Sequence, residues 1–246
     1  MAWQGEVFKA VIFPSSGEFD AGSLWTDIVG STPPNTQKTG LPPQFHSLAS
    51  GNWDEVLLQV VVQVGRIEAA LTAIDPAPTE PTPMPTLPGE QIEKVIALAR
   101  RAAGVFSKRM PTQRIAAHLQ FVEDVTSERE ATERLNALLG DVFTPSTTGQ
   151  LYQINAAKPL DAIQGGKMNR LVKWGAVSLT QVTVAVTGGV ASQGPSGQPR
   201  DLVFMHLDIN NALVGSPMTQ LQAEILTEEL WDEATRIFKE GPNVLS

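Results

Sequence analysis

The chain has 246 residues, of which 42% are hydrophobic and 18% charged, and it carries a formal net charge of −8 and no cysteine. This composition is ordinary for a globular protein with a substantial core, and no apolar run approaches the roughly 20 residues that span a bilayer. The absence of cysteine excludes disulfides, thiolate nucleophiles and cysteine-bound metals, while the negative charge opposes binding to phosphate backbones and anionic lipid.

The first part of the chain alternates strand and helix patterns. Pro14 ends a run rich in β-branched and aromatic residues, Gly30 ends a short helical pattern, and Gly65 joins two further strand-like runs. A segment rich in proline and glycine, with Pro33-Pro34 and Gly40, predicts a loop between the helix and these runs. The expected elements are a strand at 5–14, a helix at 20–30 and strands at 55–64 and 66–74.

A proline-rich spacer occupies residues 75–90, with six prolines between Pro76 and Pro88. Proline lacks an amide hydrogen and restricts the residue before it, so we expect an extended polyproline segment here. Apolar residues then recur at intervals of three and four from Ile92 to Phe106, which predicts an amphipathic helix.

The second half of the chain gives a similar order of patterns. Ser127 and Glu130 form a capping-box pattern at the start of a helix that Gly140 ends. Glycines from Gly188 to Gly197 predict a mobile hairpin loop. The expected elements are a strand at 112–125, a helix at 127–140, strands at 150–155, 170–186 and 201–210, and a helix at 219–239.

Each half therefore follows the order strand, helix, strands, helix. This order predicts an α+β protein built as a tandem pseudo-repeat, in which curved antiparallel sheets pack under long helices. We expect a first half at residues 1–110, which contains the spacer, and a second half at residues 111–246, together forming one compact unit.

Two strand histidines are the main candidates for chemistry. His118, His206 and Asp208 fall in expected strands, and His206 and Asp208 share a face because side chains alternate. Such a cluster suits a transition metal or acid–base chemistry, but half-buried structural histidines give the same pattern. No spacing matches a known metal motif or nucleophilic serine motif, so we predict no catalytic residue, metal or cofactor.

A cationic cluster is the predicted site for an anionic ligand or an acidic partner. The Gly165-Gly166 turn would bring several basic side chains together near residues 158–173. The predicted site consists of Lys158, Lys167, Arg170 and Lys173, with Asn155 and Asn169 as neutral donors. Alternatively, these cations decorate an exposed hairpin or pair with the acidic C-terminal helix.

Charge is distributed unevenly along the chain. Residues 94–122 contain six basic residues and no acid, whereas residues 201–246 contain eight acids and two bases. We expect the basic helix and the acidic C-terminal helix to face each other or water. A nucleic-acid partner would require residues 94–114 and 158–173 to join into one positive strip, so nucleic acid is not the expected partner.

The pattern LYQIN, NRLVKW and LDIN, followed by an acidic helix, resembles a sporadically distributed family of uncharacterised bacterial proteins. The likeness covers mainly residues 150–240, and Ala156 follows Asn155 where that family tends to carry a basic residue. The resemblance implies a shared fold and a bacterial origin, and it transfers no mechanism.

These observations favour a noncatalytic cytoplasmic protein that binds a protein partner or itself, as an accessory component of a bacterial multi-gene system. The N-terminal residues lack the pattern of a secretion signal, and Trp3, Trp25 and Trp53 are candidates for exposed aromatic contacts. Homodimers could form through an open sheet edge. The alternative is a small-molecule-binding or hydrolytic enzyme with its site on the concave sheet. No membrane contact is expected.

Overall fold

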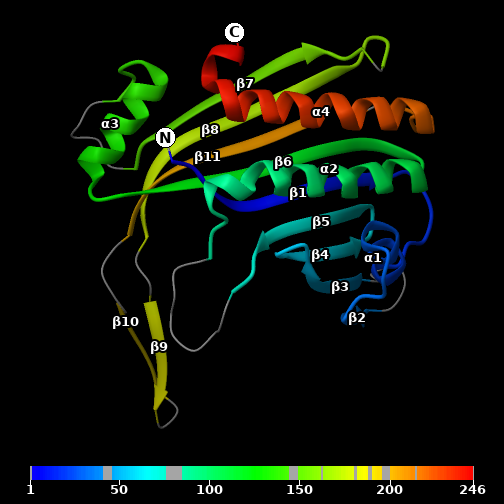
Figure 1. Cartoon of the computed structure of the whole chain (residues 1–246), viewed down its shortest axis with the longest axis horizontal. Coiled ribbons are helices and arrows are strands. Elements are labelled where there is room, and N and C mark those ends of the chain that lie inside the picture. Colours follow the sequence, from blue (N-terminus) through cyan, green and yellow to red (C-terminus); the bar gives the residue numbers. More distant parts are fainter. Residues whose placement is uncertain are drawn as a thin grey trace.

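The computed structural model of the chain describes residues 2–40, 46–75, 85–143, 149–161, 163–179, 182–187, 190–195, 200–213 and 215–245. The strands are β1 (Gln4–Pro14), β2 (Asn35–Thr39), β3 (His46–Trp53), β4 (Val56–Gln63), β5 (Arg66–Ala73), β6 (Thr112–Val125), β7 (Leu151–Pro159), β8 (Lys167–Leu179), β9 (Val182–Thr187), β10 (Val190–Pro195) and β11 (Arg200–Asn211). The helices are α1 (Ala21–Val29), α2 (Ile92–Arg109), α3 (Glu128–Leu139) and α4 (Gln220–Glu240), with short turns η1 (Gly89–Gln91) and η2 (Gly241–Leu245). Nine strands form one antiparallel sheet in the order β2-β3-β4-β5-β1-β6-β11-β8-β7, and β9 pairs with β10 in a separate hairpin (Figure 1).

The two halves of the chain meet inside this sheet. β1 pairs with β6 over a register that runs from Gln4 opposite Val122 to Pro14 opposite Thr112. The first half supplies the five strands on one side of this pairing, and the second half supplies the four on the other. We expected two sheets, but the first strands of the two halves pair with each other, so there is one. The mixed α and β character and the antiparallel pairing are confirmed, while the duplication and the curvature stay predictions.

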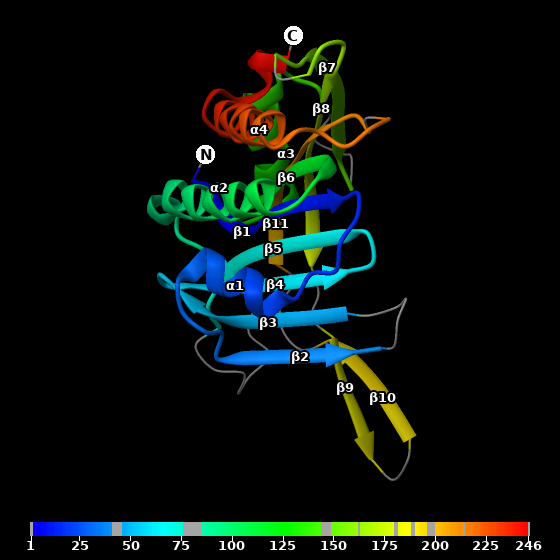
Figure 2. The same cartoon turned by 90° about the vertical axis from the view of Figure 1, so that its right-hand side faces the viewer.

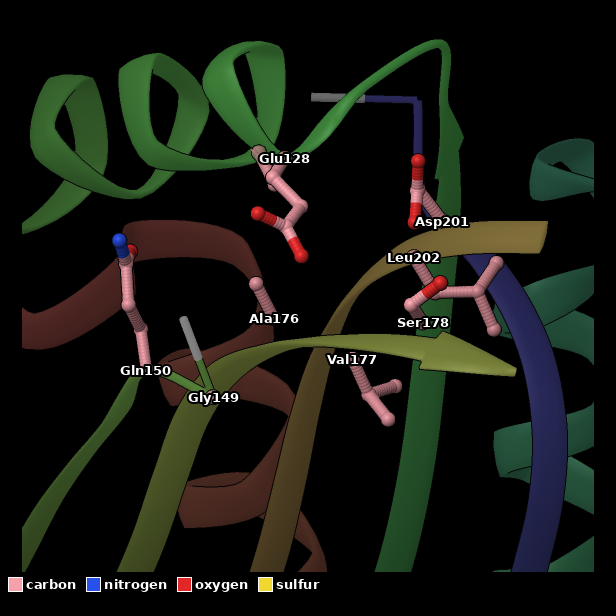
Figure 3. A pocket seen from close by; sticks show the side chains of 9 residues that line it. Glu128, Gly149, Gln150, Ala176, Val177, Ser178, Asp201 and Leu202 are labelled. Atoms are coloured by element: carbon pink, nitrogen blue, oxygen red, sulfur yellow. The ribbon is translucent and has the colours of Figure 1, made fainter. Parts of the chain in front are cut away.

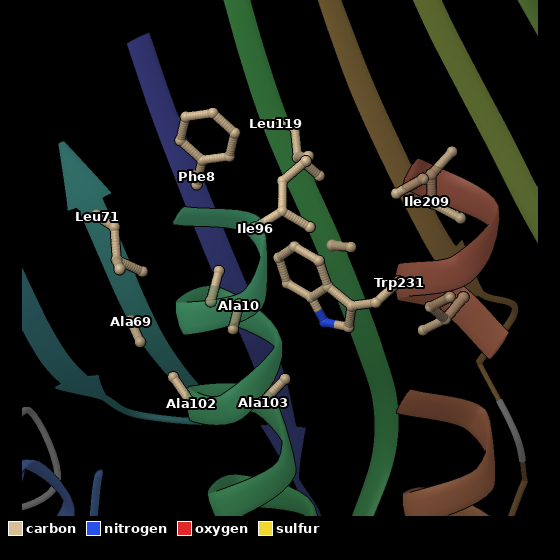
Figure 4. Close-up of a cluster of buried hydrophobic side chains, with 14 of the residues drawn as sticks. Phe8, Ala10, Ala69, Leu71, Ile96, Ala102, Ala103, Leu119, Ile209 and Trp231 are labelled. Carbon is tan, nitrogen blue, oxygen red and sulfur yellow. The ribbon is translucent and has the colours of Figure 1, made fainter. Parts of the chain in front are cut away.

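The helices cover one face of the sheet, and the hydrophobic core lies between the helices and that face. Figure 2 shows α1, α2 and α4 together on one side of the strands. Phe8, Ala10 and Ile12 alternate along β1 and are at most 1% exposed. Figure 4 shows Trp231 reaching from α4 toward Ile96 of α2 above these strands. Within the described residues no helix covers the opposite side, which we call the helix-free face.

The basic and acidic helices contact each other, as expected. Arg100 of α2 donates to Asp232 of α4 at 2.7 Å and also to Glu228, and Lys239 pairs with Glu93 at 2.8 Å. Such exposed ion pairs each contribute less than about 1 kcal/mol. Because α4 neutralises Arg100, the basic run of α2 is interrupted as a positive strip.

Most expected elements are confirmed, with changes in extent. The strand expected at 170–186 is two strands, β8 and β9, and the strand expected at 150–155 extends to Pro159 as β7. β2 and β3 fall in the segment expected to be a loop. β3 forms because its small residues pair with the apolar strand β4, with Ala49 opposite Val60, so tertiary pairing overrides weak strand propensity.

The helix starts depend on side-chain caps. Ser127 accepts a hydrogen bond from the Glu130 amide at 3.2 Å, as predicted, but the Glu130 carboxylate accepts from the Thr126 amide at 2.8 Å. The reciprocal capping box instead occurs at α4, between Thr219 and Gln222. Both arrangements satisfy amides that the helix leaves unpaired.

Several sequence-based expectations concern residues that the structure buries or does not describe. Trp25 is 1% exposed and Trp53 is 8% exposed, so neither is an exposed aromatic contact; Trp25 follows the helical spacing that turns Leu24 and Ile28 inward. Most of the proline-rich spacer, residues 76–84, lies outside the described residues. Across the described part of the chain, no helix has the length and apolarity needed to cross a bilayer.

Candidate functional site

The predicted cationic site is divided between the two faces of the sheet. Side chains alternate along a strand, so Lys158 of β7 and Arg170 of β8 both point to the helix-covered face and contact α4. The other four predicted residues alternate onto the helix-free face: they are Asn155, Lys167, Asn169 and Lys173. The six residues therefore do not form the single cluster expected from their proximity in sequence.

Glu233 of α4 gathers the cations on the helix-covered face. Its side chain is 3% exposed and accepts from Arg170 at 3.0 Å, from Lys158 at 3.1 Å and from Arg236 at 2.8 Å. Burial alone would raise the pKa of Glu233, but hydrogen bonds from Arg236, Lys158 and Arg170 outweigh it and lower the pKa below its ordinary value. Arg170 also donates to the Val244 carbonyl at 3.1 Å. This ion cluster ties β7, β8, α4 and η2 together.

The cations on the helix-free face have different surroundings. Asn169 donates to Asn210 at 3.1 Å, and Lys173 lies between Gln153 of β7 and His206 of β11 in the strand register. No ion pair holds Lys167 or Lys173 among the residues that the structure describes. These two ammonium groups therefore remain available to an external anion.

β7 forms a free edge of the sheet. It has β8 on its inner side and, in the described ranges, no strand on its outer side. Ala176 N donates to Gln150 O at 3.0 Å, and Leu160 N donates to Gly166 O at 3.1 Å. In an antiparallel ladder, alternate residues direct both backbone groups to the same neighbour. Even-numbered residues of β7 therefore bond to β8, and odd-numbered residues present their backbone groups outward.

The outward row consists of the N–H and C=O groups of Leu151, Gln153, Asn155 and Ala157. Pro159 has no N–H group, so the row of donors ends before it. The row is a template for one added strand.

A hollow of about 510 Å³, lined by apolar side chains and by Asn243 and exposed backbone, lies beside this edge on the helix-covered face. Tyr152 and Ile154 line it from β7, Leu138 and Leu139 from the end of α3, and Leu245 from η2. Figure 1 shows α3 and the C-terminus lying beside β7. The ring of Tyr152 lies 6.1 Å from that of buried Trp174, so the core holds one wall of the hollow in place.

An apolar patch flanks the same edge on the helix-free face. Leu151 is 56% exposed, Val177 is 37% exposed and Leu179 is 45% exposed. Gly175, opposite Leu151, has no side chain, and a Cβ there would lie 2.6 Å from the Phe204 ring. The ring therefore covers the backbone beside Leu151. Figure 3 shows Val177 on the side of β8 turned away from Ala176.

A polar network crosses the centre of the helix-free face. His118 lies opposite Asp208 on β11 and opposite Lys9 on β1, and its Nε2 is 2.8 Å from Gln120 Nε2. His206 lies opposite Gln120, so both histidines and Asp208 share one face.

Burial shapes the protonation of both histidines. It lowers the pKa of His206 to about 4, with further contributions from His118 and Lys173. Burial also lowers the pKa of His118, although the Asp208 carboxylate opposes this shift. Both imidazoles are therefore neutral near pH 7. Among the described residues, no group of three or more histidines and carboxylates is arranged to hold a metal ion.

The cavity of Figure 3 is too small for a substrate. Glu128 and Asp201 face it, its volume is about 20 Å³, and a space of that size admits about one water.

The chain matches no protein-family model and no curated protein sequence. The sequence analysis identified Lys158 and Arg170 but missed Glu233, their shared partner, and the side chains around the β7 edge. Tyr152 and Ile154 alternate with polar residues in the sequence, and that alternation was the available signal for a strand with one apolar face.

Proposed function

We propose that the chain is a noncatalytic binding protein that accepts a protein partner, or a second copy of itself, along the β7 edge. The observation that carries this proposal is the outward row of backbone groups on β7, flanked by apolar side chains on both faces. Strand addition obtains affinity from backbone hydrogen bonds and selectivity from pockets for alternate side chains. The hollow at Tyr152 and Ile154 is such a pocket.

The amino-acid composition supports a cellular location for this binding activity. The cysteine-free, acidic sequence fits the bacterial cytoplasm, where we place the protein as an accessory component of a multi-gene system. Two halves related by duplication, each contributing a sheet edge, form part of the same proposal.

Light scattering and copurification test the proposal together. Gln153→Pro removes one outward donor from β7 without removing a hydrogen bond to β8. Asn35→Pro is the matched control, because it places proline at the first residue of the opposite edge strand, β2. We expect association, whether with itself or with a copurifying protein identified by mass spectrometry, to be lost with Gln153→Pro and kept with Asn35→Pro. A strictly monomeric protein without a copurifying partner, or equal association of both variants, would overturn the proposal.

A second candidate is small-molecule binding, or hydrolysis, on the helix-free face. The observation that favours it is the shared face of His118, His206 and Asp208. Histidine resonances in NMR spectra should then shift together when small carboxylates or phosphates are added. No response from either ring to any of these anions would eliminate this candidate.

A further inference from the structure

We propose that the β7 edge takes an extended peptide segment that runs antiparallel to β7, acidic in its amino-terminal half and apolar in its carboxyl-terminal half. This inference rests on the proposed function and specifies the partner. Each part of it follows from a different feature of the edge.

The backbone of the edge requires an extended partner. Outward N–H and C=O groups recur at every second residue from Leu151 to Ala157, and a strand is the conformation that matches this spacing. Every pairing in the nine-stranded sheet is antiparallel, and antiparallel pairs are the more common kind. The seven residues span about 20 Å, which suits a segment of seven or eight residues.

The beginning of β7 requires apolar side chains. Alternate residues of an added strand would point to opposite faces of the sheet. On the helix-covered face they would meet the hollow lined by Tyr152 and Ile154, and on the helix-free face they would meet Leu151 and Val177. Consecutive apolar residues of the partner would therefore both be buried beside this end of β7.

The end of β7 requires acidic side chains. Residues 151–179 contain four cations and one acid, Asp161. Lys158 is 47% exposed and shares the single carboxylate of Glu233 with Arg170 and Arg236, and Lys167 is exposed. On the helix-covered face, Asp161, Glu229 and Asp232 line the same hollow as Lys158, Glu233 and Arg236, so this face carries no excess of positive charge. The cations at this end that no described ion pair holds, Lys167 and Lys173, lie on the helix-free face. Alternate acidic side chains of an added strand would point to that face. An antiparallel partner places its amino-terminal half here.

The same polarity argues against a second copy of the chain. Two β7 strands that pair antiparallel over their full length would bring the Leu151 end of one copy against the Lys158 end of the other. Each apolar end would then meet a basic end. A partner with an acidic end avoids this mismatch.

Fluorescence anisotropy with designed peptides tests the inference on the full chain. The probe is a labelled, end-blocked octapeptide with glutamate and threonine alternating in its first four positions and valine and isoleucine in its last four. One comparison peptide replaces the glutamates with lysines, and another reverses the order of the halves. We expect the probe to bind at least about tenfold more tightly than either comparison peptide, with the difference from the lysine peptide shrinking at high salt.

Variants locate the binding. Gln153→Pro and, as a second route, Leu151→Lys should each weaken probe binding at least about tenfold, whereas Asn35→Pro should leave it unchanged. Circular dichroism establishes that each variant is folded.

The outcomes separate the two proposals. Equal binding of the probe and the lysine peptide, or binding that Gln153→Pro and Leu151→Lys leave unchanged, overturns the inference. A β7-dependent homodimer that excludes the probe also overturns the inference, but it supports the proposed function. If neither the probe nor any protein associates with the chain in a way that depends on β7, both the inference and the proposed function are overturned.

Discussion

The nine-stranded sheet ends in two edge strands of opposite character, β2 and β7, which lie at opposite ends of the sheet in Figure 2. β2 has five residues, all polar and all exposed, and its Lys38 pairs with Asp20 at the surface at 2.8 Å. β7 has nine residues, apolar neighbours on both faces, and Lys158 tied to a buried carboxylate. Short length, polarity and lysine are common devices against unwanted strand pairing. β2 has all three, whereas β7 is longer, alternates Tyr152 and Ile154 with polar residues, and carries its lysine and proline only at one end.

The ion pairs that support the two edges should differ most in energy. Glu233→Gln leaves three cations around a neutral buried group, and breaking a buried ion cluster in this way costs about 3–5 kcal/mol. Asp20→Asn removes an exposed pair, keeps a side chain that can cap α1, and should cost less than about 1 kcal/mol. Urea unfolding of both variants measures the difference. Equal losses would contradict the contrast between the edges.

Glycines beside the two edges give the next effect. A Cβ at Gly175, in the strand next to β7, would lie 2.5 Å from the backbone oxygen of Gln150. A Cβ at Gly51, in the strand next to β2, would lie 2.3 Å from the Pro34 side chain. The backbone of a hydrogen-bonded strand can move less to relieve such a contact than a side chain in a surface loop can. We expect Gly175→Ala to cost about 1–3 kcal/mol and Gly51→Ala to cost less. Thermal unfolding compares the pair, and the reverse order would refute the reasoning.

Acid should destabilise the fold through His206 of β11, which lies on the β7 side of the sheet. His206 is neutral in the folded chain, with a pKa of about 4 against an ordinary 6.5. The unfolded chain therefore binds the proton more readily, so stability is complete above pH 6.5 and falls as the pH drops toward 4. Because the ring is only partly buried, we expect roughly 1–2 kcal/mol, below the full linkage value.

The control for this effect is His206→Gln, which should reduce the slope of the stability profile over the same range; part of the slope should remain because burial also lowers the pKa of His118. Unfolding curves recorded from pH 7 to pH 4 make the measurement. A profile that is identical in the variant and the original chain would show that another group is responsible. Glu233 contributes separately: its lowered pKa gives stability that is present above its ordinary value and is lost as the pH falls through the folded value.

The smallest effect on folding belongs to the exposed edge itself. Leu151→Thr shortens a side chain that is 56% exposed and should change stability by less than about 0.5 kcal/mol. The same substitution should weaken peptide binding, because it removes apolar surface from the flank of β7. A variant that loses stability but keeps binding would reverse this assignment.

Periodicity predicted most of the elements, because apolar spacing determines which face of a helix or strand is buried. It did not predict β3, whose small residues become a strand only through pairing with β4. It also did not predict that β1 and β6 pair, since nothing local specifies which strands become neighbours. One sheet therefore replaced the expected two.

The candidate site was predicted only in part, because local sequence does not specify which distant residues become neighbours. Lys158 and Arg170 are close in sequence to Lys167 and Lys173, but strand alternation places the two pairs on opposite faces. Their partner, Glu233, lies 63 residues beyond Arg170, and a contact at that separation leaves no local pattern. The free edge follows from strand order, which the sequence does not state.

Amide hydrogen exchange along β7 tests the central claim most directly. In the free chain, the outward amides of Leu151, Gln153, Asn155 and Ala157 should exchange rapidly, while the inward amides of Tyr152, Ile154 and Ala156 stay protected by β8. Adding the acidic–apolar peptide should protect the outward set and leave the inward set unchanged. Equal protection of both sets in the free chain, or an outward set that the peptide leaves unprotected, would contradict a free edge that accepts a strand.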